Sequence, residues 1–199
     1  MMPEEFVAID TETGGTHPNR DAVLQIGAVH FVRGEPKESF SIDVRPSDEA
    51  TFCLGALKVC GVDSMALLKE RLVKGAVERD AMIQFRDWFQ TGLGYGRNKE
   101  SRPWVVGYNL SFDINFLKAL GDRAEAPVWY FINPKKQIDV LTIARFAQAI
   151  GKMPEPPDGK LASVAAALSI SVPEGIHNAR VDAELVGNVF LKLMERIRS

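Results

Sequence analysis

Hydrophobic and polar positions follow strand-like patterns at the start of the chain and helical patterns later. Three strands are predicted first, at Phe6–Glu12, Val23–Arg33 and Glu38–Val44. The first opens with an unbroken apolar run, Phe6–Ile9, which is typical of a strand covered on both faces. Residues 34–36, with the sequence Gly-Glu-Pro, predict a hairpin turn between the second and third strands.

The remainder of the chain shows helical periodicity interrupted by one more strand. Residues 48–73 predict short helices and loop, and Arg79–Gln90 is amphipathic at helical spacing. Trp104–Tyr108 predicts a short buried strand that turns directly into a helix, with Asn109 or Ser111 as the N-cap. Further helices are expected at Asp139–Ile150, Leu161–Leu168 and about Asn178–Ile197. This order predicts an α/β fold, a mixed sheet with helices on its faces.

Length and composition are those of an ordinary globular protein. The chain has 199 residues, of which 46% are apolar and 25% charged, consistent with one domain. No apolar stretch reaches the roughly 20 residues that cross a bilayer. The expected strand at Phe6 leaves no room for a secretory signal peptide. Cys53 and Cys60 form no metal or redox motif, so we expect buried or free thiols in a reducing cytoplasm.

The charge balance restricts how the protein could contact nucleic acid. A formal net charge of −2 excludes attachment through bulk positive charge. It leaves open an enzyme that contacts phosphates through metal ions, because the cation then comes with the metal. The glycine-rich residues 92–96 follow a predicted helix instead of a strand, so a surface loop is favoured over a phosphate cradle.

Asp10 and Glu12 end the first strand with two carboxylates on one face, because side chains alternate along a strand. Partial burial makes it costly to ionise both, so either they reach solvent or a cation lies between them. A second Asp-x-Glu, at Asp182 and Glu184, shows that the pattern alone does not decide between these alternatives.

Three more residues change the balance when they are taken together. Asp113 lies in the first turn of a helix that follows a strand, His177 precedes the last helix, and Asp182 lies inside that helix. Singly, each has an ordinary explanation: a helix dipole, a loop histidine and an exposed carboxylate. Jointly, carboxylates suit hard divalent ions, and a histidine after the loop at Pro173-Glu174-Gly175 suits a general base.

The segments AIDTETGG, YNLSFDINFL and HNARVDA resemble, in order, the three motifs of the DEDDh 3′–5′ exonucleases. That family includes proofreading subunits of bacterial replicative polymerases, ribonuclease T and oligoribonuclease. The resemblance spans roughly Phe6 to Phe190. It implies a ribonuclease H-like fold, with a mixed five-stranded sheet and helices on both faces, in a single exonuclease domain over residues 1–199.

The resemblance also implies roles for the five motif residues, with two Mg²⁺ or Mn²⁺ ions as cofactors. Asp10 would bridge both ions. Glu12 and Asp182 would complete the site of the ion that activates water, and Asp113 would serve the second ion. His177 would be the general base.

Further family positions are expected near the substrate. Thr13 and Gly14 lie where family members hold the 3′-terminal nucleotide, and Asn109 and Phe112 lie where they line the substrate groove. Asp139 matches a recurrent aspartate that we interpret as supporting structure.

The sequence departs from the family pattern at a few positions. Gln25 stands where many members have glutamate, and Tyr108 where many have histidine. Three consecutive aromatic residues, Trp129–Phe131, are followed closely by two lysines, Lys135 and Lys136. The segment has two interpretations: a contact for single-stranded nucleic acid, or aromatic core residues followed by a solvated turn.

The resulting hypothesis is a cytoplasmic, metal-dependent exonuclease that releases nucleoside 5′-monophosphates from the 3′ end of single-stranded DNA or RNA. The alternatives are an exoribonuclease acting on short or structured RNA ends, and a non-catalytic nucleic-acid-binding or polymerase-associated subunit. A polymerase partner or a homodimer is compatible with the exonuclease hypothesis and with its alternatives. No membrane association is expected.

Overall fold

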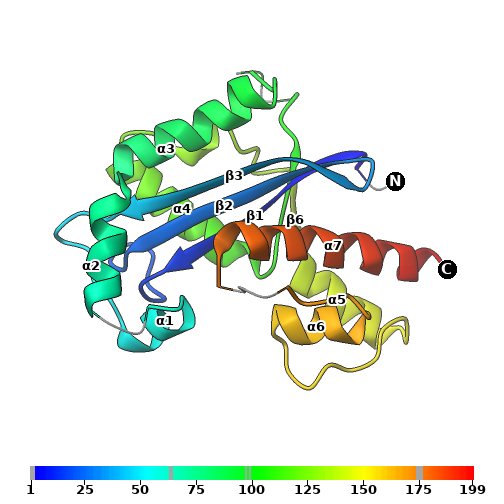
Figure 1. Cartoon of the computed structure of the whole chain (residues 1–199). Helices are drawn as coiled ribbons and strands as arrows, with labels where there is room; N and C mark the ends of the chain where they lie inside the picture. The colour runs from blue at the N-terminus through cyan, green and yellow to red at the C-terminus, as the bar shows by residue number, and fades with distance from the viewer. Residues whose placement is uncertain (1–2, 63–64, 97, 99, 174–176) are drawn as a thin grey trace.

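The computed structural model of the protein describes residues 3–62, 65–96, 98, 100–173 and 177–199. Within these residues, six strands form one sheet in the order β4-β3-β2-β1-β5-β6 (Figure 1). The strands are β1 (Glu5–Thr13), β2 (Val23–Val32), β3 (Glu35–Arg45), β4 (Ala76–Val77), β5 (Trp104–Gly107) and β6 (Gln137–Asp139). Strands β1, β2 and β3 pair antiparallel, whereas the β1–β5, β5–β6 and β3–β4 pairs are parallel.

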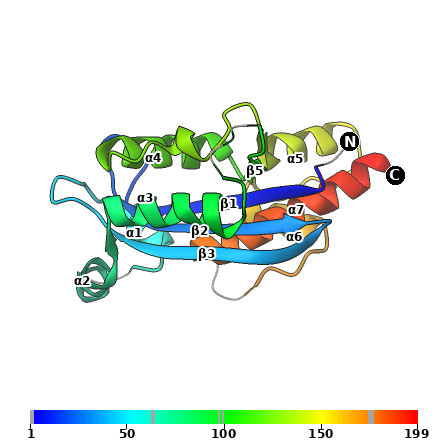
Figure 2. The ribbon, with the colours of Figure 1, turned by 90° about the horizontal axis from the view of Figure 1, so that it is seen from above.

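Helices cover both faces of this sheet. They are α1 (Leu54–Val59), α2 (Met65–Lys74), α3 (Glu78–Asp87), the π-helix η1 (Trp88–Gly92), α4 (Leu110–Arg123), the 3₁₀ helix η2 (Val128–Tyr130), α5 (Val140–Ala149), α6 (Leu161–Ala167) and α7 (Ala179–Arg198). Figure 2, seen from above, shows α3 in front of the strands and α7 behind them. The predicted α/β class is confirmed. None of the described helices is long and apolar enough to cross a membrane.

The apolar run of β1 is buried because a separate core lies on each face of the sheet. Val7 and Ile9 pack in the core beneath α3 and α4. Phe6 and Ala8 point the other way, into the core beneath α5, α6 and α7. All four side chains are at most 1% exposed, so the central strand is fixed from both sides.

The sheet differs from the sequence prediction at its edges. It has six strands, whereas the residue pattern predicted four and the family resemblance implied five. The pattern misses β4 and β6 because they hold too few residues to give a period. The β2–β3 turn is formed by Arg33 and Gly34, with φ of 53° and 84°, so the prediction of a turn at residues 34–36 was wrong in register. Pro36 lies inside β3, at an irregularity opposite Phe31. Bulges tolerate proline because the ladder is already interrupted there.

Helix α7 lies directly on β2, and two glycines make this approach possible. A Cβ atom at Gly27 of β2 would overlap the backbone of Ala179 and Arg180, at the start of α7. A Cβ atom at Gly187 of α7 would overlap the ring of Phe31 on β2. The position of the first turn of α7 therefore depends on the absence of a side chain at residue 27.

We expect Gly27→Ala to lower the free energy of unfolding by about 1–3 kcal/mol, since α7 must move away to make room for the methyl group. Urea denaturation followed by circular dichroism measures this change. Gly159→Ala is the control, because a Cβ atom there meets no atom within 4 Å. Equal stability of the two variants would contradict the close packing of α7 on β2.

Candidate active site

Strand β1 carries the first two carboxylates to one end of the sheet. Asp10 and Glu12 share the parity of Phe6 and Ala8, whose side chains pack toward α7. Glu12 is only 6% exposed. The two acids therefore lie at the end of a rigid strand, on the face that α7 covers.

Helix α4 supplies the third carboxylate. Asp113 lies in its first turn and is 3% exposed. Its Oδ1 accepts hydrogen bonds from the backbone N–H of Thr11 (2.9 Å) and from the Thr11 hydroxyl (2.8 Å). Thr11, which lies between Asp10 and Glu12, thus links β1 to Asp113 through two hydrogen bonds.

The start of α7 supplies Asp182 and His177. The Asn178 side chain is the N-cap and accepts from Val181 N–H at 3.3 Å. The His177 backbone N–H donates to Asp182 Oδ2 at 2.9 Å, and the residue has φ of 77°. The predicted loop before His177 includes residues 174–176, which lie outside the described part of the chain.

These residues converge on one point. One ligand atom each from Glu12, His177 and Asp182 lie within 4.8 Å of one another, a group that could hold a metal ion. The pKa of Asp10 is raised well above its ordinary value by burial and then by the charges of Asp113, Glu12 and Asp182. The structure therefore brings all five predicted motif residues together.

Burial dominates the electrostatics of the other two perturbed acids. It raises the pKa of Asp113 to about 7, although the hydrogen bonds from Thr11 act in the opposite direction. It also raises the pKa of Asp182, opposed by the backbone N–H and the charge of His177. Without a cation, the cluster resists full ionisation.

A cleft of about 630 Å³ opens at this cluster. It is lined by residues from β1, α1, α5, α6 and α7 and from the segments after β5, before α6 and before α7: Asp10, Val59, Tyr108, Asn109, Leu141, Gly159, Lys160, Leu161, Ala162, His177, Asp182 and Leu185. Asn109 lies here as expected, at the N-cap position of α4, with φ of 59° and no side-chain capping bond. Phe112 is half-buried and packs against Phe116, with ring centroids 4.8 Å apart, and its predicted role in the substrate groove stays a prediction.

Thr13 and Gly14, expected near the 3′-terminal nucleotide, are both buried and engaged by the protein. Gly14 N–H donates to the Ala22 carbonyl (2.8 Å), and the Gly14 carbonyl accepts from Cys53 N–H (2.6 Å). The Cys60 thiol donates to the Thr13 carbonyl at 3.3 Å. The loop that follows the carboxylates is thus held in one shape. The substrate roles of these two residues stay predictions.

Two residues near the cluster have more contacts than the sequence indicated. Asp139 accepts from Asn109 N–H (2.9 Å) and Leu141 N–H (3.1 Å), which confirms its supporting role. Gln25, given no role from sequence, accepts from Ala179 N–H at 2.8 Å. Its partner lies 154 residues away in sequence, so only the tertiary structure reveals the contact.

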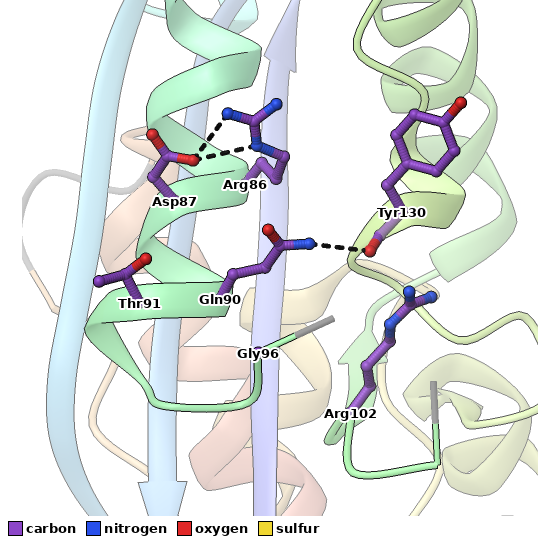
Figure 3. Close-up of a pocket in the computed structure, with 7 residues that line it drawn as sticks. All are labelled: Arg86, Asp87, Gln90, Thr91, Gly96, Arg102 and Tyr130. Atoms are coloured by element: carbon purple, nitrogen blue, oxygen red, sulfur yellow. Dashed lines mark hydrogen bonds and ion pairs between the residues drawn. The ribbon is translucent and has the colours of Figure 1, made fainter. Parts of the chain in front are cut away.

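A second hollow, of about 680 Å³, lies at the junction of η1 and η2 and includes Tyr130 (Figure 3). Its polar groups are largely paired: Arg86 with Asp87 at 2.8 Å, and Gln90 Nε2 with the Tyr130 carbonyl at 3.0 Å. Phe131 is 1% exposed and belongs to the core. Lys136 Nζ donates to two backbone carbonyls. Core and turn therefore explain most of this aromatic and basic segment.

Comparison with known proteins relates the chain to nucleases. The sequence profile of a family described as "Exonuclease" matches residues 7–92. Cap18 of Escherichia coli, a 3′–5′ DNA exonuclease, is 36% identical over 115 residues, which are 57% of this chain and 55% of Cap18. Ribonuclease T of Marinobacter nauticus is 27% identical over 197 residues, 96% of this chain and 83% of that enzyme.

The fold is shared with a solved nuclease. The zinc-bound complex of E. coli exonuclease I with single-stranded DNA has a TM-score of 0.77 and 21% identity, covering 98% of this chain and 41% of that one. The chain thus spans about half of Cap18 and less than half of exonuclease I. The chain thus shares the ribonuclease H-like fold of exonuclease I, and its residues 7–92 match the exonuclease profile, in agreement with the resemblance seen in the motifs.

Proposed function

We propose that this protein is a metal-dependent 3′–5′ exonuclease whose single domain spans the chain and releases nucleoside 5′-monophosphates. The observation that carries the proposal is the convergence of Asp10, Glu12, Asp113, Asp182 and His177 at one end of a cleft. A purely binding subunit has no use for four mutually repelling carboxylates, which would also repel phosphate.

The donor set fits hard divalent ions. Four carboxylates provide oxygen ligands of the kind that Mg²⁺ and Mn²⁺ prefer. Burial raises the pKa values of Asp10, Asp113 and Asp182, and neighbouring carboxylates raise those of Asp10 and Asp113 further, a repulsion that a cation relieves. When bound, two such ions supply charge that activates water and stabilises the leaving oxygen. Asp10 is the best candidate for a ligand shared by both ions, because its pKa responds to all three other carboxylates.

The remaining carboxylates divide by position. Glu12 and Asp182 lie with His177 on the α7 side and would hold the ion near the attacking water. Asp113, fixed by Thr11, would hold the ion near the leaving oxygen. His177 would take the proton of the attacking water on a ring nitrogen, and its backbone bond to Asp182 keeps the ring beside that ligand.

The substrate is proposed to be a single-stranded 3′ end, and the exonuclease I complex, which contains single-stranded DNA, supports the single-stranded part of this proposal. DNA is favoured by the higher identity to Cap18, whereas RNA is supported by the match to ribonuclease T over nearly the whole chain. Thr13, Gly14 and Asn109 are proposed to contact the terminal nucleotide. A polymerase partner or a second copy of the chain is compatible with this cleft.

The first test is cleavage of 5′-labelled and 3′-labelled single strands of DNA and of RNA with Mn²⁺ or Mg²⁺. We expect a descending ladder from the 5′ label and immediate mononucleotide release from the 3′ label, both abolished by EDTA. Asp10→Asn should remove essentially all activity, because it removes the charge of the proposed shared ligand. Asp122→Asn is a folded control, which neutralises an exposed carboxylate outside the cluster. Cleavage in excess EDTA would overturn the metal mechanism.

A second prediction concerns the base. His177→Ala is expected to lower kcat by about 10²–10⁴-fold, the usual range for proton transfer, with a much smaller effect on KM. The rate of the variant should depend on pH differently from that of the wild type, because the group that accepts the proton has been removed. His17→Ala, at an exposed histidine after β1, should leave the rate nearly unchanged. Single-turnover rates across pH decide, and a His177→Ala profile like that of wild type would exclude the role.

A third prediction concerns stability in chelator. Asp113 has a pKa of about 7 in the folded protein against an ordinary 3.8. Between these values the folded state keeps a proton that the unfolded state releases, so the free energy of unfolding falls as pH rises from about 4 to about 7. One proton gives at most about 1.4 kcal/mol per pH unit. Thermal melts in EDTA measure the slope.

Asp113→Asn should make that slope shallower, because the amide does not ionise, although Asp10 and Asp182, whose pKa values are also raised, keep part of it. Added Mn²⁺ should raise the stability of the wild-type protein near pH 7. Asp122→Asn, at an exposed position on the same helix, should keep the slope and serves as the control here too. Stability that rises across this window in EDTA would contradict the electrostatic description of the cluster.

A further inference from the structure

Gln25 occupies the centre of a row of polar side chains that crosses the sheet. In the register of the sheet it lies directly opposite Glu12 on β1 and directly opposite Asp43 on β3. Directly opposed residues of antiparallel strands point to the same face. A neutral amide therefore separates two acids on the face that α7 covers.

Both ends of this amide are used. Gln25 Oε1 accepts from the backbone N–H of Ala179 at 2.8 Å, and Gln25 Nε2 donates to Asp43 Oδ1 at 2.9 Å. The side chain is 5% exposed, so water does not substitute readily for either bond. Because Nε2 must donate to Asp43, the orientation of the amide is fixed, with its oxygen toward the helix.

The acceptor bond holds the part of α7 that carries Asp182. Ala179 is the first residue of α7, where N–H groups have no partner inside the helix. Gln25 binds one of them, and the Asn178 side chain binds another, at Val181. Asp182 follows in the same turn and meets Glu12, the cross-strand neighbour of Gln25. One side chain thus links the strand-borne and the helix-borne carboxylates.

We propose that Gln25 is a positioning residue that sets the distance between Glu12 and Asp182, and thereby the affinity of the site for divalent ions. This inference rests on the proposed function. It explains why an amide suits this position: a glutamate would set three carboxylates side by side across β1, β2 and β3, and it has no N–H to donate to Asp43. The requirement comes from Asp43 and is thus a property of this chain.

The test exchanges donor and acceptor between the two strands. Gln25→Glu should weaken Mn²⁺ binding about 10–100-fold, the usual effect of disturbing a group that orients a metal ligand, because repulsion from Asp43 would move the new carboxylate away from its bond with Ala179 N–H. Asp43→Asn alone should bind nearly as the wild type, because the amide oxygen that it introduces still accepts from Gln25. The double variant, Gln25→Glu with Asp43→Asn, should recover most of the loss, since the new amide donates to the new carboxylate.

Calorimetric titration with Mn²⁺ alone, without nucleic acid, measures these affinities, and thermal melts in EDTA verify that each variant folds. Amide exchange at Ala179, followed by NMR, reports the bond itself and should be faster in Gln25→Leu. A folded Gln25→Glu protein with wild-type Mn²⁺ affinity, or a double variant no better than Gln25→Glu, would overturn the proposal. A wild type that binds Mn²⁺ but leaves nucleic acid intact would refute the proposed function alone.

Discussion

The constraint on which this structure depends is the repulsion among four carboxylates held at one end of the central strand. A protein avoids such an arrangement unless the chain is prevented from relaxing, since separating the charges is favourable whenever no cation is present. Here three restraints prevent the carboxylates from moving apart. Strand β1 is buried on both faces, Asp113 is bound by Thr11, and Asp182 is bound by the backbone of His177. The fold stabilises the charge cluster that the proposed chemistry needs.

The position of α7 on β2 is determined both by close packing and by a hydrogen bond. Gly27 lets the helix backbone approach β2, and Gln25, two residues earlier on the same strand, bonds to the first helical N–H. Because side chains alternate along β2, both positions face α7. Packing fixes how close the helix lies, and the hydrogen bond fixes its first turn. The position of Asp182 is thus determined by a strand whose own residues are not predicted ligands.

Sequence reasoning succeeded where the information is local and failed where it is not. The run Phe6–Ile9 predicts a doubly covered strand because burial on both faces removes any polar position, and the three motifs locate the carboxylates. Strands β4 and β6 were not predicted, because two or three residues are too few to show an alternating hydrophobic pattern. The turn register depended on positive φ at Arg33, which composition does not mark. Gln25 has partners on β3 and α7 that no pattern along β2 reveals.

The charge of the cleft links metal and substrate. Of the described residues that line it, Lys160 is the one lysine or arginine, and it already lies 3.7 Å from Asp158. Asp10 and Asp182 face the same space, so a phosphodiester entering alone meets negative charge with little to offset it. Under the proposed function, metal ions therefore supply most of the attraction for the terminal phosphate, and binding of either component strengthens binding of the other. A chain with a net charge of −2 can then act on a polyanion without a basic surface, because the positive charge is concentrated at the bond to be cut.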